Sequence, residues 1–203
     1  MPRADPQISR RLLYGNAWLQ IGLFEARPTS DACGEVERQN LNAIALPLSG
    51  VFSKHDRPGQ HVVGTPSHAV FFAPDVPYRI GFPGAIGDRA ISLGFGAELA
   101  PEQLDWSGGR DSPASQGLLP ANAILLRNLL WRQLRDHHTD AIEIEARALD
   151  LLHLSLQSVR PDNTPMRLST RMRRMRAVER VKEAVAQAPA DAWDVAQLAA
   201  IAH

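Results

Sequence analysis

Glycine and proline divide this chain into two parts with different folding options. All 14 glycines lie at or before Gly117, and 12 of the 15 prolines lie at or before Pro120. Both residue types interrupt regular structure and favour turns, whereas the sequence that follows is rich in helix-forming residues. The distribution predicts a turn-rich β region followed by helices.

Short apolar segments in the first part indicate strands. In residues 18–26, every second residue from Leu19 to Leu23 is apolar, which is the period of a half-buried strand. Similar segments are separated by Pro, Gly and Asp, and this spacing is typical of a β-sandwich or barrel. Residues 1–16 are expected to be a flexible polar arm. The other expected strands cover residues 41–48, 51–55, 61–63, 69–72, 78–80 and 89–95.

Two apolar helices are expected next, at residues 121–137 and 140–159. Asp140 and Glu143 have the spacing of a capping box at the start of the second helix. The short link between the helices favours an antiparallel pair. One side of the pair should cover the β region, and a remaining apolar side is a candidate dimer interface. The alternative is that both sides pack within the chain. The interface candidates are Leu125, Leu129, Leu152 and Leu156.

The last thirty residues contain two further helix signals. From Arg174 the apolar residues follow an i, i+3, i+4 pattern, and Pro189 ends that helix. A second helix is expected to start at Asp194, with Gln197 completing a capping box and Trp193 lying just outside it. Residues 161–172 are expected to be a linker.

This C-terminal stretch resembles the start of the DNA-binding domain of AraC/XylS-family transcription regulators. The resemblance rests on Arg180-Val181 and on residues 193–199, W-D-V-A-Q-L-A. It implies that residues 173–203 hold the first helix of that domain and the supporting helix of its first helix-turn-helix unit, without the recognition helices. It also implies that the complete protein binds DNA. Arg174 is a candidate phosphate contact.

The β region resembles the cupin-type sensor domain of the same regulators. The matching runs are I-A-L-P-L-S-G-V-F (44–52), S-H-A-V-F-F-A-P-D-V-P-Y-R-I-G-F-P (67–83) and G-D-R-A-I-S-L-G-F (87–95). The resemblance implies a β + α fold: a cupin-like β-barrel, or double-stranded β-helix, at residues 17–117. A helical dimerisation pair at 118–160 and the truncated helix-turn-helix segment would follow.

The resemblance to cupins raises the question of whether this chain has the residues that bind a metal. Metal-binding cupins use two histidines and a glutamate from one motif and a histidine from a second. Here the first region offers only His55, and Tyr78 stands where the second histidine would be. We therefore expect no metal, no cofactor and no enzymatic activity, and instead a small-molecule pocket at the barrel mouth. Its candidate residues are Phe52, His55, His61, Phe71, Tyr78 and Arg79.

Charge is unevenly distributed along a chain whose formal net charge is zero. Residues 167–203 contain seven basic and four acidic residues, whereas the first 166 contain 15 basic and 18 acidic residues. A basic end on an acidic body is compatible with a nucleic-acid-binding module, although a solvated basic helix gives the same count. A single cysteine, Cys33, and the absence of a signal peptide or a membrane-length apolar run favour a cytoplasmic protein.

These observations favour a ligand-responsive transcription regulator, of which this chain is the sensor and dimerisation portion. Its small-molecule effector would shift the placement of the DNA-binding domains between two states. The first alternative is a cupin-fold enzyme, an isomerase or oxygenase with a helical extension. The second is an interaction module with a filled barrel.

Overall fold

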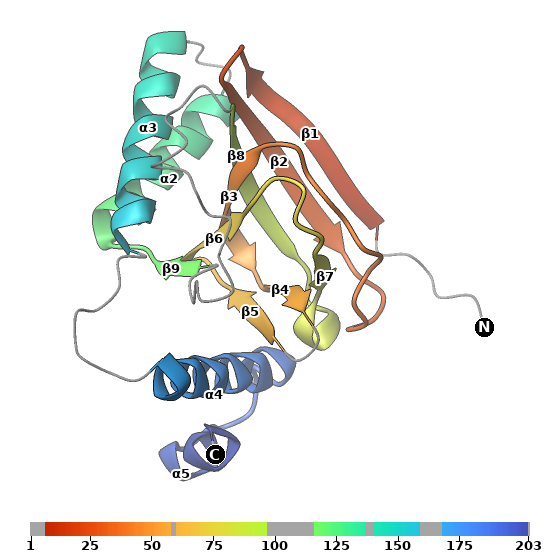
Figure 1. Ribbon diagram of the computed structural model, residues 1–203. Helices are drawn as coiled ribbons and strands as arrows, with labels where there is room; N and C mark the ends of the chain where they lie inside the picture. The colour runs from red at the N-terminus through yellow and green to blue at the C-terminus, as the bar shows by residue number, and fades with distance from the viewer. Residues whose placement is uncertain (1–6, 58–59, 97–115, 137–139, 159–167, 203) are drawn as a thin grey trace.

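The computed structural model describes residues 7–57, 60–96, 116–136, 140–158 and 168–202, and its elements follow the expected order of strands and then helices (Figure 1). The β elements are β1 Gln7–Gly15, β2 Leu19–Arg27, β3 Asn42–Gly50, β4 Phe52–Arg57, β5 Gln60–Gly64, β6 His68–Phe72, β7 Arg79–Gly81, β8 Asp88–Phe95 and β9 Gln116–Leu118. The helical elements are the 3-10 turn η1 Pro83–Ala85 and the helices α2 Ala121–Arg135, α3 Ala141–Ser158, α4 Leu168–Gln187 and α5 Val195–Ala202.

The strands form two antiparallel sheets. The larger has the order β1-β2-β8-β3-β6-β9, and the smaller has the order β5-β4-β7. The chain leaves the larger sheet at Gly50, where φ is +75° and a Cβ atom would lie 2.2 Å from the carbonyl oxygen of Gly87. Only glycine combines this backbone conformation with so close an approach. The S-G break between two apolar segments is therefore the point where the chain changes sheets.

Both faces of the larger sheet are covered, which makes the protein a stack of three layers. Leu19, Ile21 and Ile91 project from one face into a core shared with α2 and α3. Ala43 and Phe72 project from the other face into a second core shared with the smaller sheet. Because side chains alternate across a strand, β2, β3 and β6 contribute to both cores. Figure 1 shows α2 and α3 beside the larger sheet.

The expected fold class is confirmed. A cupin-like β-sandwich of two antiparallel sheets is followed by helices, and each of the seven strands expected after residue 17 is present. β9 adds a short strand at the boundary between the two parts, where Gly117 pairs with Ala69 of β6. The helix pair also begins and ends within about two residues of its expected bounds.

The expected flexible arm at residues 1–16 is wrong for the part that the structure describes. Residues 7–15 form β1, which pairs with β2 from Gln7 opposite Arg27 to Gly15 opposite Gln20. β1 is an edge strand, and edge strands commonly carry charged side chains that discourage pairing with other molecules. Its two arginines made the segment resemble a polar arm. Residues 1–6 lie outside the described residues.

A buried arginine holds α2 against the sandwich. Arg127 is 3% exposed, and its Nη1 donates to the carbonyl oxygens of Pro47 and Pro66. On α3, Leu152 is 8% exposed in the same core, and Leu156 is partly buried against it. The prediction that Leu152 lies in a dimer interface is therefore wrong, because this face of α3 covers the larger sheet.

The C-terminal region also differs from the expected boundaries. α4 starts at Leu168, inside the expected linker, and continues without interruption to Gln187. It contacts β5 and η1, and α5 packs against it. Among the α4 residues whose burial the structure describes, Glu179 is buried, at 4% exposure, whereas Val178 of the expected apolar stripe is 55% exposed. Polar contacts therefore contribute to the packing of α4 on the sandwich.

The start of α5 has the capping box that its sequence predicts. The backbone N–H of Gln197 donates to Oδ1 of Asp194 at 2.7 Å, and the N–H of Asp194 donates to Oε1 of Gln197 at 2.9 Å. At the other end, the Arg180 side chain donates to the carbonyl oxygens of Ile201 and Ala202. Within the described part of the chain, no helix is long and apolar enough to span a membrane.

Candidate ligand pocket

A pocket of about 380 Å³ lies on the face of the larger sheet that is turned toward the smaller sheet. Its floor consists of small side chains at alternate positions of three neighbouring strands. In the register, Ser92 lies opposite Gly22 on one side and opposite Ala45 on the other. Larger residues at these positions would fill the space between the sheets. The small floor residues are Gly22, Ala43, Ala45, Ala90, Ser92 and Gly94.

Aromatic side chains form the walls of the pocket. Phe24, Phe52, Phe72 and Tyr78 all line it, and the rings of Phe72 and Tyr78 meet edge to face with centroids 4.9 Å apart. Two aromatic faces already contact cations. Arg10 lies over Phe24 at 5.5 Å, and a lysine Nζ lies over Phe72 at 4.9 Å. Such contacts are favourable because the ring face carries negative partial charge.

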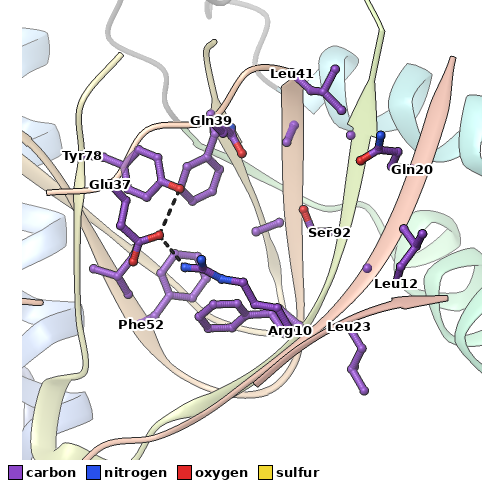
Figure 2. A pocket seen from close by; sticks show the side chains of 18 of the residues that line it. Arg10, Leu12, Gln20, Leu23, Glu37, Gln39, Leu41, Phe52, Tyr78 and Ser92 are labelled. Carbon is purple, nitrogen blue, oxygen red and sulfur yellow. Dashed lines mark hydrogen bonds and ion pairs between the residues drawn. The ribbon is translucent and has the colours of Figure 1, made fainter. Parts of the chain in front are cut away.

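A polar cluster of three side chains lies at one side of the pocket (Figure 2). Nη2 of Arg10 is 2.5 Å from Oε2 of Glu37, and the hydroxyl of Tyr78 is 3.5 Å from the same oxygen. Backbone hydrogen bonds between Glu37 and Tyr78 in both directions fix this arrangement. Burial, together with the Glu37 carboxylate, raises the pKa of Tyr78 to about 12. The phenol therefore remains a hydrogen-bond donor at neutral pH.

Two polar atoms of lining residues are buried without a hydrogen-bond partner. They are Oδ1 of Asp88 and Nε2 of Gln39. Burial raises the pKa of the Asp88 carboxyl to about 7. Buried polar groups in native proteins nearly always have a hydrogen-bond partner. Two such atoms without a partner in a pocket therefore indicate a place for a polar ligand.

The structure brings two of the six predicted ligand residues into this pocket. Phe52 and Tyr78 line it. Phe71 is 2% exposed in the core beneath α2 and α3, and its neighbour Phe72 lines the pocket instead. The prediction for Phe71 is wrong by one residue. A shift of one position along a strand moves a side chain to the opposite face.

The other three predicted residues lie on the outer face of the smaller sheet. His55 pairs with His61 on β5 and with Arg79 on β7, and the two histidine rings stack at 5.1 Å. Nε2 of His61 lies 2.9 Å from Oε2 of Glu183 on α4. His55 is three positions from the inward-facing Phe52, so it points away from the pocket. His61 therefore contacts α4, and none of the three residues lines the pocket.

The described side chains do not fit the metal centre of a metal-binding cupin. His55 and His61 are on the wrong face of their sheet, and within the described ranges no group of three or more His, Cys, Asp and Glu side chains is placed to hold a metal ion. The absence of metal chemistry remains a prediction. The pocket itself contradicts the alternative of a filled barrel.

Sequence reasoning missed most of the polar lining residues. Arg10 lay in the supposed arm, and Glu37 and Gln39 belong to a stretch with little regular pattern. Asp88 stands between a glycine turn and a strand, where an exposed position is the usual case. A usable signal was present in β8, where Ala90, Ser92 and Gly94 alternate with large apolar residues. Such alternation indicates an open space on one face of a sheet.

Comparison with solved structures finds cupin-fold proteins. The chain is similar to the EutQ protein of Clostridium difficile, with 14% identity over 47% of this chain and 72% of that chain and a TM-score of 0.40. A cupin domain from Bordetella pertussis has 13% identity over 48% and 99% of the two chains, with a TM-score of 0.38.

A structure of the DMSP lyases RdDddP and RnDddQII has 15% identity over 46% of this chain and 49% of that chain, with a TM-score of 0.39. No protein-family model and no curated protein matches the chain. These identities and TM-scores are too low to assign the activity of any of these proteins to this chain.

Proposed function

We propose that the chain is the sensor and dimerisation portion of a ligand-responsive transcription regulator of the cytoplasm, and that it is not an enzyme. The carrying observation is the pocket of about 380 Å³ with unpaired polar atoms in its lining. The AraC-like sequence of α4 and α5 supports the regulatory part of the proposal. DNA is the proposed macromolecular partner of this regulator.

The contact between α4 and the sandwich offers a route from the pocket to the helices. The carboxylate of Glu179 accepts hydrogen bonds from the Val63 backbone N–H on β5, from the Gln116 amide on β9 and from Lys182 on α4 itself. β9 pairs with β6, and β6 carries Phe72 into the pocket. A ligand that displaces Phe72 would therefore move β6 and, through their pairing, β9, which contacts α4.

The mechanism is a change in the population of two states. In one state α4 is docked on the sandwich through Glu179, and in the other it is released. A ligand shifts this equilibrium only by its difference in affinity for the two states. On the exposed side of α4, Arg173, Arg174 and Arg176 are available for phosphate contacts. In the homodimer, the two chains would meet through the exposed side of α2 and α3, which includes Leu125 and Leu129.

A fragment screen with a pocket-blocking variant tests the proposal. Small aromatic amines, alcohols and carboxylates are screened by thermal shift against the wild-type chain and against Ser92→Phe, whose ring would occupy the space over Gly22 and Ala45. A ligand at a hundredfold excess over its Kd stabilises the folded state by about 2.7 kcal/mol. We expect ligands that stabilise the wild type and not Ser92→Phe. Ser9→Phe, on the exposed edge strand, is the matched control.

The second measurement is amide hydrogen exchange in α4 with the best ligand bound. The proposal requires that exchange at residues 178–187 changes on binding. Ligands that act equally on Ser92→Phe would place binding elsewhere. Ligands that leave α4 unchanged, or chemical turnover of a bound compound, would contradict the regulatory role.

A further inference from the structure

The carboxyl of Asp88 is the most unusual group in the pocket. The residue is 7% exposed, and its Oδ1 has no hydrogen-bond partner. It occupies the first of four alternate positions of β8 that line the pocket, followed by Ala90, Ser92 and Gly94. It lies opposite Ala26 of β2 and Gly50 of β3, neither of which offers a polar side chain.

An isolated buried carboxylate is costly unless an opposite charge or hydrogen-bond donors accompany it. Among the described side chains near the pocket, Arg10 pairs with Glu37 at 2.5 Å, Lys54 pairs with Asp56 at 2.7 Å, and Arg38 donates to the carbonyl oxygen of Asp75. Arg11 also lines the pocket, but it is exposed on the edge strand β1. Burial is the cause of the raised pKa of Asp88, with no cation to offset it. The carboxyl of Asp88 therefore lacks a partner within the described protein, and a ligand can supply one.

The surrounding walls favour a particular ligand body. Phe24, Phe52 and Phe72 present rings to a space whose floor is small and largely apolar. A flat apolar group packs well in such a space, and a positive charge is attracted to aromatic faces. The arginine over Phe24 and the lysine over Phe72 show that these faces accept cations in this protein.

We propose that the pocket binds a small primary amine with an aromatic body, whose ammonium group pairs with Asp88 and whose ring lies among Phe24, Phe52 and Phe72. This inference rests on the proposed sensor function and names the chemical class of its effector. The buried carboxylate selects the charge, and the aromatic walls and the floor select the shape.

Isothermal titration calorimetry at pH 8 tests the class with three matched probes. They are 2-phenylethylamine, its neutral analogue 2-phenylethanol and the anion 3-phenylpropionate. We expect the wild-type chain to bind the amine about tenfold or more tightly than either analogue, the range expected for a charge-assisted hydrogen bond. Asp88→Asn keeps the shape of the side chain and removes its charge. It is expected to abolish the preference for the amine while leaving the affinity for the alcohol unchanged.

Asp191→Asn, at an exposed position between α4 and α5, is the matched control and should retain the preference. Failure of the wild type to bind 2-phenylethylamine overturns the proposal, as does an unchanged preference in Asp88→Asn. Amine binding that persists in Ser92→Phe also overturns it. If the alcohol or the anion binds the wild type, is lost in Ser92→Phe and exceeds the amine, the amine class fails while the sensor pocket stands. Circular dichroism of each variant checks its folding.

Discussion

The buried charged side chains of this protein differ in how their loss of hydration is compensated. Arg127 donates to two backbone carbonyls, Lys54 pairs with Asp56, and Glu179 accepts hydrogen bonds from a backbone amide and two side chains. Each arrangement replaces the water that burial removes. Asp88 is the exception, because its Oδ1 has no partner. At the scale of the residue, this difference separates the groups that hold the fold from the one that we propose pairs with a ligand.

The raised pKa of Asp88 predicts a specific dependence of stability on pH. Its folded-state pKa is about 7, against 3.8 for an aspartate in the unfolded chain. The unfolded chain therefore loses this proton first, and the folded state is progressively destabilised as pH rises from about 4 to about 7. Asp88→Asn removes the effect. Without ligand, its Tm should exceed that of the wild type by about 4 °C or more at pH 8, and the excess should shrink toward pH 5.

Differential scanning calorimetry between pH 5 and pH 8 makes this measurement. Asp191→Asn should follow the wild type throughout. A Tm difference between Asp88→Asn and the wild type that does not vary with pH would mean that Asp88 ionises normally in the folded state.

At the scale of the element, α4 depends on polar contacts with the sandwich. Among its described side chains Glu179 is buried, and Glu183 contributes the contact with His61. η1 contacts the C-terminal end of α4, where a Cβ on Gly84 would lie 2.8 Å from the carbonyl oxygen of Ala186. Gly84 has φ +64°, so glycine is required there both for the backbone conformation and for the close contact.

Removal of the Glu179 carboxylate should release α4. Glu179→Ala leaves the Val63 N–H and the Gln116 amide without an acceptor, and an unsatisfied buried donor costs about 1–3 kcal/mol. We expect amide exchange in α4 to accelerate by about tenfold or more, while exchange in β2 and β8 stays unchanged. Hydrogen exchange with mass spectrometry measures both. Glu35→Ala, at an exposed loop position, is the control. Unchanged exchange in α4 would show that other contacts hold the helix.

At the scale of the whole molecule, the side of α2 and α3 that faces away from the sheet retains apolar residues. Leu125 is 60% exposed and Leu129 is 38% exposed. They line a shallow groove between the two helices together with Leu126, Leu154 and the polar residues Asn122, Asp150 and His153. Because the opposite side of the pair is already buried on the larger sheet, this side is the part of the predicted interface that remains available.

We expect the chain to be a dimer that this groove mediates. Replacing both Leu125 and Leu129 with aspartate puts two like charges on each copy of a self-complementary surface, and should convert the dimer to a monomer. Sedimentation equilibrium at micromolar concentration measures the mass. Val195→Asp on α5, where the side chain is 83% exposed, should remain dimeric. A monomeric wild-type chain, or a double variant that stays dimeric, would exclude this interface.

Local patterns predicted much of the fold. The alternation in residues 18–26, the S-G break at Gly50 and the confinement of glycine to the first part correspond to β2, to the change of sheet and to the boundary before α2. The capping box of Asp194 and Gln197 is also present as its spacing indicates. These features depend on the conformational preferences of a few neighbouring residues, which sequence carries directly.

The candidate site was harder to predict, because its residues come from strands and loops that are distant in sequence. A period of two reveals that a strand has two faces, but not which face meets the helices and which meets the pocket. For this reason Phe71 was expected in the position that Phe72 occupies. His55 and His61 were assigned to the pocket, although they lie on the outer face of the smaller sheet. The choice depends on which layer packs on each side of the larger sheet.

The order of strands and helices was thus determined by the sequence alone, through turn residues and periodicity that act over short distances. Only the tertiary structure decided that β1 joins the larger sheet, that Leu152 is core and that Asp88 lacks a partner. The physical reason is that burial and charge pairing depend on what other segments place against a residue. Those contacts form between elements that are distant in sequence and meet only in the folded chain.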